Sequence, residues 1–321
     1  MNGVELLRGA PGILMEGAII ERLRRDSSIR LDPAVLNTVL LGSVEGRKVL
    51  RCISREYLDV GARYGLPMMV CTPTWKANPE RLAKVNLGTV RQVSAGAFGY
   101  LDDIRNGYGS YAKMVLIGGL LGNRGDAYRG DHALQEEEAA AFHCEQAEAL
   151  AEAGVDFLLA ATLPALTEAV GIARAMALTG KPYVVSFIVR RSGRLLDGTS
   201  LAAAMETIDG VVVPPPAFYL VNCVHPAVFE EAVSADECYR KNPSCRLTGL
   251  QANTSTRNPE ELDGLPELDQ EDPHLFAGSM MHACHRFGLR VLGGCCGTDA
   301  RHIEALAVRM APRKRSDNEE D

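Results

Sequence analysis

Eight short runs of apolar residues recur along the chain, and longer stretches with the spacing of helices separate most of them. The runs do not alternate between apolar and polar positions, so they predict strands that are buried on both faces. They span residues 12–16, 67–72, 113–118, 155–161, 183–189, 218–224, 246–251 and 290–294. Such strands form a parallel sheet covered by helices, and eight of them predict a single α/β barrel of the (β/α)8 type.

The clearest helical patterns lie at residues 132–153, which Gly154 ends, and at residues 167–179, which Gly180 and Pro182 follow. No glycine-rich phosphate motif follows the first strand, so a doubly wound nucleotide-binding fold is the second choice. No linker divides the chain. We expect one barrel domain over residues 1–312 and a charged, disordered tail over residues 313–321, which has no apolar anchors.

Composition excludes several classes of protein. The chain has 321 residues, of which 46% are hydrophobic and 23% are charged, which is typical of a globular protein. A net charge of −7 argues against nucleic-acid binding. No apolar run approaches the roughly 20 residues that span a membrane, and the first 11 residues lack the pattern of a signal peptide. Nine cysteines, an odd number, favour a reducing compartment, so we expect a cytoplasmic protein.

Cysteines stand at two of the predicted strand ends, and in such barrels the active site lies at the carboxyl ends of the strands. Cys223 belongs to the sixth run, and Cys295 and Cys296 follow the eighth. The two ends would lie two strands apart on one rim, where three sulfurs can converge. Adjacent residues of a strand point to opposite faces, so the chain must leave strand geometry there. Glycines provide the freedom to do so, at positions 293, 294 and 297.

Three thiolates favour zinc and leave its fourth ligand position open, as in catalytic sites. Zn²⁺ with three thiolates carries a net charge of −1, which makes a poor Lewis acid and a poor source of hydroxide. It would instead keep an incoming thiol deprotonated, although a free thiol has a pKa near 8.5. Alkylation of a thiol follows more naturally than hydrolysis. The alternative is that these cysteines are small buried hydrophobic residues.

Further polar residues at predicted strand ends are candidates for the site. Glu16 ends an apolar strand, an unusual place for a carboxylate unless it faces a pocket, so we assign it to catalysis and substrate contact. His225 would point the same way as Cys223 if strand geometry persisted, and could act as an acid or base. We assign four more side chains to substrate binding: Thr74, Ser186, Asn222 and Asn253.

Two features of the same rim concern the methyl donor. Trp75 could receive a cationic donor on its ring, the alternative being that it packs beneath a helix beginning near Pro79. Gly118 to Gly125 read as a flexible loop after the third strand, which could contact the donor or simply connect two elements.

At these residues the sequence resembles the homocysteine S-methyltransferase family, and the resemblance covers nearly the whole chain in order. The closing motif is the most specific. The matching segments are Gly294-Cys295-Cys296-Gly297-Thr298 with His302-Ile303, Asn222-Cys223, Ser186-Phe187 with Asp197-Gly198-Thr199-Ser200, Glu16-Gly17-Ala18, and Tyr57-Leu58 with Gly61-Ala62 and Thr72-Pro73-Thr74.

The resemblance implies a zinc-dependent barrel that binds homocysteine through its sulfur and methylates it to methionine. It implies the same three cysteines as metal ligands and Glu16 as the partner of the substrate ammonium group. The chain departs from the family at three places. Ala161 stands where the family has a Glu that helps to hold the amine, Pro73 replaces an Asn, and Gln251-Ala252 replace Tyr-Pro before Asn253.

The function expected from the sequence is therefore a zinc-dependent S-methyltransferase that acts on a small-molecule thiol, most simply homocysteine in methionine biosynthesis. The donor is open: S-methylmethionine, S-adenosylmethionine, a betaine or a methylated corrinoid protein, which would be a separate partner. Two alternatives stay open. One is a zinc-binding barrel without methyl transfer, acting as a sensor or an assembly subunit, and the other is the same chemistry on a different thiol.

Overall fold

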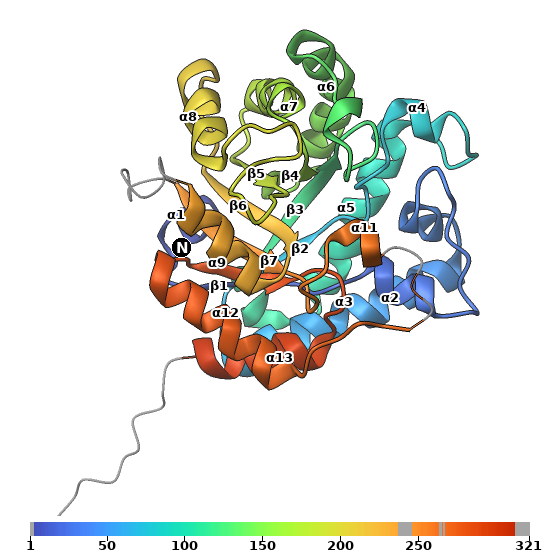
Figure 1. The fold of residues 1–321 in the computed structure, drawn as a ribbon. Coiled ribbons are helices and arrows are strands. Elements are labelled where there is room, and N and C mark those ends of the chain that lie inside the picture. Colours follow the sequence, from blue (N-terminus) through green and yellow to red (C-terminus); the bar gives the residue numbers. More distant parts are fainter. Residues whose placement is uncertain (1–2, 237–245, 263–264, 266, 312–321) are drawn as a thin grey trace, which may run out of the picture.

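Eight parallel strands pair in sequence order and close into a barrel, because β1 also pairs with β8. The computed structural model describes residues 3–236, 246–262, 265 and 267–311. Its strands are β1 (Ile13–Met15), β2 (Met68–Cys71), β3 (Val115–Gly122), β4 (Phe157–Leu163), β5 (Tyr183–Phe187), β6 (Phe218–Val224), β7 (Leu247–Ala252) and β8 (Val291–Gly294). The predicted (β/α)8 barrel is confirmed (Figure 1).

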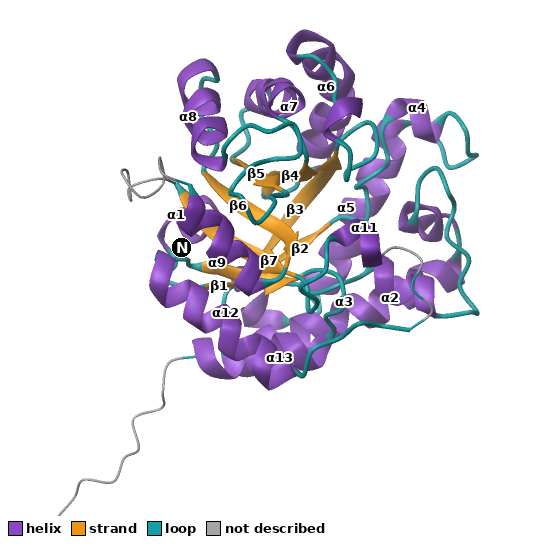
Figure 2. Cartoon of the chain, viewed as in Figure 1, coloured by secondary structure: helices purple, strands orange, loops and turns teal. Residues whose placement is uncertain are grey.

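Helices surround the strands on the outside of the barrel (Figure 2). They are α1 (Gly3–Gly9), α2 (Ile20–Arg25), α3 (Val44–Tyr64), α4 (Pro79–Leu82), α5 (Val90–Asn106), α6 (Glu136–Ala153), α7 (Leu166–Leu178), α8 (Leu201–Val211), α9 (Pro226–Ala235), α11 (Pro259–Leu262), α12 (Pro273–Phe287) and α13 (Ala300–Met310), with 3-10 turns at Asn37–Gly42 (η1), Gly109–Met114 (η2) and Gly130–His132 (η3). The helix predicted from residue 132 thus begins at Glu136. It ends as predicted before Gly154, whose left-handed backbone suits a glycine.

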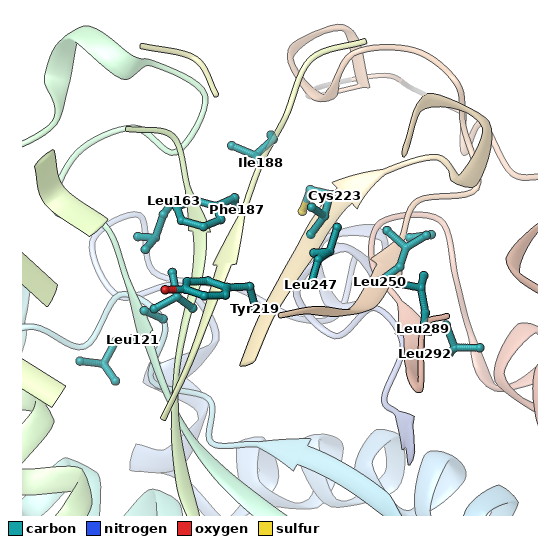
Figure 3. Close-up of a cluster of buried hydrophobic side chains, with 14 of the residues drawn as sticks. Leu121, Leu163, Phe187, Ile188, Tyr219, Cys223, Leu247, Leu250, Leu289 and Leu292 are labelled. Carbon is teal, nitrogen blue, oxygen red and sulfur yellow. The ribbon is translucent and has the colours of Figure 1, made fainter. Parts of the chain in front are cut away.

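The core has two layers, because successive strand residues point to opposite faces. In β4, Phe157, Leu159 and Ala161 fill the barrel interior, whereas Leu158 and Ala160 pack outward against the helices. Figure 3 shows part of the outer layer, with Cys223 at the carboxyl end of β6. Both faces of the strands are therefore buried, which is why their sequences are apolar throughout.

The short helix α1 closes one end of the barrel. Leu6 and Leu7 join the cluster of side chains inside the barrel. The helix contacts η2, which immediately precedes β3. It therefore lies at the amino ends of the strands and leaves the carboxyl ends for the site.

The third strand is longer than the sequence predicts, since it runs to Gly122 and contains Gly118 and Gly119. The flexible loop expected from Gly118 is wrong for these positions. A Cβ on Gly118 would lie 2.5 Å from the Phe157 ring, and one on Gly119 would lie 3.0 Å from Leu150. The glycines permit close packing of a strand instead of providing a flexible loop.

The predicted tail at residues 313–321 lies outside the described residues, as do Cys238 and Cys245. Within the described ranges, no helix is both long and apolar enough to cross a membrane. The seven described cysteines are free thiols.

Candidate functional site

Three cysteine sulfurs meet at the carboxyl ends of β6 and β8. The Sγ atoms of Cys223, Cys295 and Cys296 all lie within 4.8 Å of one another, and those of Cys223 and Cys295 are 2.8 Å apart. Cys223 is buried, and the other two are partly exposed. Across the part of the chain that the structure describes, this is the one cluster of three or more Cys, His, Asp or Glu residues with this geometry. The convergence that the sequence predicts is present.

A bulge in β6 aims the first of these sulfurs. Cys223 has a φ of +58°, and the pairing of β6 with β7 shifts between Asn222 and Val224. A non-glycine residue in this region costs about 1–3 kcal/mol, and such bulges often re-aim side chains at functional sites. Nothing in the sequence marks this conformation.

A second bulge lies two strands away in β4, where Thr162 has a φ of +62°. The Asn222 amide joins the two bulges. Its Nδ2 donates to Thr162 Oγ1 at 2.7 Å, and its Oδ1 accepts from the Thr162 N–H at 3.0 Å. The two irregular strand ends therefore support each other.

The other two sulfurs sit on a turn that directly follows β8, so the chain leaves strand geometry there as predicted. The Thr298 N–H donates to the Cys295 carbonyl at 3.1 Å. Of the three glycines, only Gly297 has a positive φ, at +85°. Gly293 and Gly294 serve a different purpose, because a Cβ on either would collide with Met15 or Thr298.

Three of the predicted substrate-binding side chains hold the cysteines in place. Asn222 Nδ2 lies 3.3 Å from Cys223 Sγ, and Ser186 Oγ donates to Asn222 Oδ1 at 2.6 Å. Asn253 donates to the Cys223 carbonyl at 3.0 Å and accepts from the Cys296 N–H at 3.1 Å. Their polar atoms already have protein partners, so contact with a substrate stays a prediction.

Thr74 and His225 are also engaged within the protein. Thr74 Oγ1 donates to the Leu120 carbonyl at 2.7 Å. Strand geometry does not persist to His225, because β6 ends at Val224; instead His225 Nδ1 accepts from the Ala227 N–H at 3.1 Å and caps α9. Its Nε2 lies 3.3 Å from Glu271 Oε2. The expected orientation of His225, in the same direction as Cys223, is therefore wrong. Its catalytic role stays a prediction.

Glu16 is a buried carboxylate with unused capacity. Its side chain follows β1 and is only 6% exposed. Oε1 accepts from the Cys71 N–H at 3.0 Å, whereas Oε2 has no hydrogen-bond partner among the described residues. Burial raises the pKa of Glu16 to about 8. A cationic group placed beside Oε2 would stabilise the ionised form.

The three thiols hold charge unequally. Hydrogen bonds from Cys295 and Cys296 hold the pKa of Cys223 well below its usual range. The hydrogen bonds with Cys223 raise the pKa of Cys295 and of Cys296. Cys223 is thus the preferred thiolate of the cluster, with two thiol donors beside it.

Glu21 is a residue of this site that the sequence does not reveal. It lies in the first turn of α2, and its Oε2 accepts the Gly297 N–H. Burial and the neighbouring Cys296 raise the pKa of Glu21. An acid in the first turn of a helix is ordinary, so no signal in the sequence distinguishes it.

Trp75 lies beside the position where the family carries an acid. Its indole N–H donates to the Ala161 carbonyl at 3.2 Å, and a Cβ on Gly122 would lie 2.5 Å from the ring nitrogen. The buried Lys76 ammonium stands 4.5 Å from the ring centre. Burial lowers the pKa of Lys76 to about 7, so this amine is only partly charged near neutral pH. Its position over the ring and the indole hydrogen bond favour the packing role of Trp75. Ala161 itself faces the barrel interior and is 7% exposed.

The donor set fits a zinc ion. Three sulfurs lie close together at the rim of the barrel, and Cys223 is already favoured as a thiolate. Asn222 contacts the Cys223 sulfur, and Asn253 holds the backbone of Cys296. Soft thiolate ligands select zinc over hard cations, and three protein ligands leave a fourth position for another molecule. The arrangement can therefore hold a metal and present it to a ligand at the barrel opening.

Comparison with known proteins gives a family match and several relatives. The family model described as homocysteine S-methyltransferase matches residues 13–310. The homocysteine S-methyltransferase YbgG of Bacillus subtilis is 29% identical over 96% of this chain and 98% of its own length. The homocysteine S-methyltransferase of Escherichia coli is 26% identical over 92% of this chain and 94% of its own length.

More distant similarities agree with the fold. The chain is 22% identical to bovine betaine–homocysteine S-methyltransferase 1, covering 97% of this chain and 75% of that protein. It matches 22% of the length of the methionine synthase of Mycobacterium tuberculosis. The crystal structure of the metallated Escherichia coli homocysteine methyltransferase MmuM superposes with a TM-score of 0.74 at 23% identity, covering 96% of this chain and all of that one.

The burial of Glu16 predicts a pH dependence of stability. The folded protein keeps the Glu16 proton up to a pH of about 8, whereas the unfolded chain releases it near 4.5. The contribution of protonated Glu16 to the free energy of unfolding is therefore fully present below pH 4.5. It falls by up to about 1.4 kcal/mol per pH unit as the pH rises to about 8. In metal-free protein, Glu16→Gln should gain stability relative to wild type across this interval, as measured by urea unfolding.

The exposed Glu45, which has no such burial, supplies the control variant Glu45→Gln. The difference in the free energy of unfolding between Glu45→Gln and wild type should stay constant over the same pH range. A constant difference between Glu16→Gln and wild type from pH 5 to pH 8 would contradict the burial argument.

Proposed function

The chain belongs to the homocysteine S-methyltransferase family and is an S-methyltransferase, and from that premise we propose that it methylates homocysteine with the help of a zinc ion. The proposed ligands are Cys223, Cys295 and Cys296. The observation that carries the proposal is their convergence at the open end of the barrel. Glu16 follows the neighbouring strand β1, its carbonyl accepts the Gly294 N–H at 3.1 Å, and its buried carboxylate has one oxygen without a hydrogen-bond partner among the described residues. We take residues 1–312 as the catalytic barrel.

The chain's own residues position the acceptor. When bound, zinc would supply a fourth ligand position at which the acceptor sulfur is held as a nucleophilic thiolate. Glu16 Oε2 would accept a hydrogen bond from the ammonium group of homocysteine. This contact would stabilise the ionised form of Glu16. Asn222 and Asn253 keep Cys223 and Cys296 in place while the acceptor binds.

The reaction needs alignment more than proton transfer. A carbon–sulfur bond forms between the acceptor sulfur and the methyl group, and the bond from methyl to donor breaks with its electron pair left on the donor. The acceptor's thiol proton would pass to solvent when the acceptor binds, before this step. Holding both reactants in line supplies much of the acceleration in reactions of this kind.

The donor is proposed only as a class: a small sulfonium or ammonium compound, or a methylated corrinoid carried by a partner protein. Relatives named for betaine and for methionine synthesis support both possibilities. The amine of Lys76 already lies over the ring of Trp75, so we do not assign a cationic donor to that face.

The test combines metal binding with a donor screen. Reduced wild-type protein should bind one zinc ion and form methionine from homocysteine with at least one donor, detected by mass spectrometry. Cys296→Ser should lose tight zinc binding and activity but keep its circular dichroism, because the cysteine lies at the rim and not in the core. Cys52→Ser, at an exposed thiol far along the chain, is the control.

A zinc-free wild-type protein with full activity would contradict the proposal. A barrel that unfolds when zinc is removed would contradict the placement of the metal at the rim. A fully metallated protein that makes no methionine with any donor would favour the second candidate, a zinc-binding barrel that does not transfer methyl groups. Ala161 is the observation that favours this candidate or a different acceptor thiol, because the site lacks an acid there.

Ala161 also generates a prediction about affinity. Ala161→Glu should strengthen homocysteine binding roughly tenfold or more, because a charge-assisted hydrogen bond to the ammonium is worth about 1.5–3 kcal/mol. Calorimetric titration of the zinc-loaded protein measures the change. Ala161→Gln is the matched control, since it has the same size without the charge. Equal affinities of wild type and Ala161→Glu would mean that Glu16 alone neutralises the ammonium.

A further inference from the structure

The turn that carries Cys295 and Cys296 is held by partners from several other segments. The Cys296 N–H donates to Asn253 Oδ1 at 3.1 Å, and the Thr254 N–H donates to the Cys296 carbonyl at 3.1 Å. Gln270 Nε2 donates to the Gly297 carbonyl at 2.5 Å. The remaining donor at the centre of the turn, the Gly297 N–H, has the Glu21 carboxylate as its acceptor.

Apart from the third cysteine of the cluster, Cys223, Glu21 is the one ionisable side chain with a direct hydrogen bond to this turn among the contacts of the described residues that involve positions 295–297. It reaches the turn across 276 positions of sequence. Its other oxygen faces Arg25 at 3.4 Å, which holds the carboxylate in place. The Thr298 hydroxyl adds a second link, since it accepts from the Ala18 N–H at 3.0 Å and donates to the Cys295 carbonyl at 2.6 Å.

The turn has little freedom of its own to replace this contact. Gly297 has a positive φ of +85°, and a Cβ there would overlap Thr254. If the carboxylate is removed, the N–H of the buried Gly297 loses its acceptor, and an unmade hydrogen bond of this kind is costly. Rotation of the peptide to find water would move the adjacent Cys296.

We propose that Glu21 is a positioning residue for the metal centre, which keeps the Cys295–Thr298 turn in the conformation that directs both sulfurs toward Cys223. The proposal rests on the proposed function in one respect, namely that the three sulfurs bind zinc. Residues that orient metal ligands commonly contribute ten- to a hundredfold in metal affinity.

The test uses the full chain with Glu21→Ala and Glu21→Gln. Glu45→Ala is the matched control, because Glu45 is also the second residue of its helix but is exposed and far from the turn in sequence. Zinc affinity is measured by competition with a chromophoric chelator. The visible spectrum of the cobalt-substituted protein reports ligand geometry. Hydrogen exchange of the metal-free protein, followed on a peptide containing Gly297, reports the turn itself.

Glu21→Ala should lower zinc affinity ten- to a hundredfold, alter the cobalt spectrum and speed exchange at Gly297. Glu21→Gln should recover most of the affinity, because its side-chain oxygen can still accept the N–H. Glu21→Ala and Glu45→Ala should both remain folded, as judged by circular dichroism. Wild-type affinity and unchanged exchange in Glu21→Ala would overturn the proposal, as would equal losses in Glu45→Ala.

Failure of the proposed function gives a different result. If wild-type protein binds neither zinc nor cobalt, the proposed metal centre is rejected. Hydrogen exchange of the metal-free protein still tests whether Glu21 holds the turn. Faster exchange in Glu21→Ala than in Glu45→Ala supports its hold on the turn, whereas equal exchange rejects it.

Discussion

Parallel strands bring residues to the rim of a barrel, but a regular strand cannot direct adjacent side chains at one point. The site depends on two departures from strand geometry: the bulge at Cys223 and the turn from Cys295 to Thr298. Both are unfavourable by themselves, since one places a non-glycine residue at positive φ and the other needs glycine at 297. They persist because hydrogen bonds from other segments compensate their cost.

The compensating groups are mostly amides and hydroxyls that look like substrate ligands in the sequence. Asn222 connects the β4 and β6 bulges, and Asn253 connects the Cys223 carbonyl to the Cys296 amide. Glu16 differs from them, because only one of its oxygens has a hydrogen-bond partner in the part of the chain that the structure describes. Polar groups of the rim thus divide into those that build the metal centre and one carboxylate with capacity for a ligand.

Much of the fold could be predicted from the sequence. Strands buried on both faces have continuous apolar runs, and each of the eight predicted runs overlaps an observed strand. The main error was at β3, where Gly118 and Gly119 suggested a loop. Their small size instead makes room for Phe157 and Leu150, which are distant in sequence. The sequence alone does not distinguish a glycine that makes a loop flexible from one that allows close packing, because the packing partners are known only from the tertiary structure.

The sequence by itself determined the barrel, the family and the three cysteines at two strand ends, because each depends on local patterns and on the common rim that parallel strands share. The tertiary structure decided how the sulfurs are aimed and which side chains hold them. Glu21 and Thr162 reach the site through contacts between segments distant in sequence, and His225 is turned into a helix cap. Such contacts leave no periodicity or spacing in the chain, since they arise only when separate loops meet at the end of the barrel.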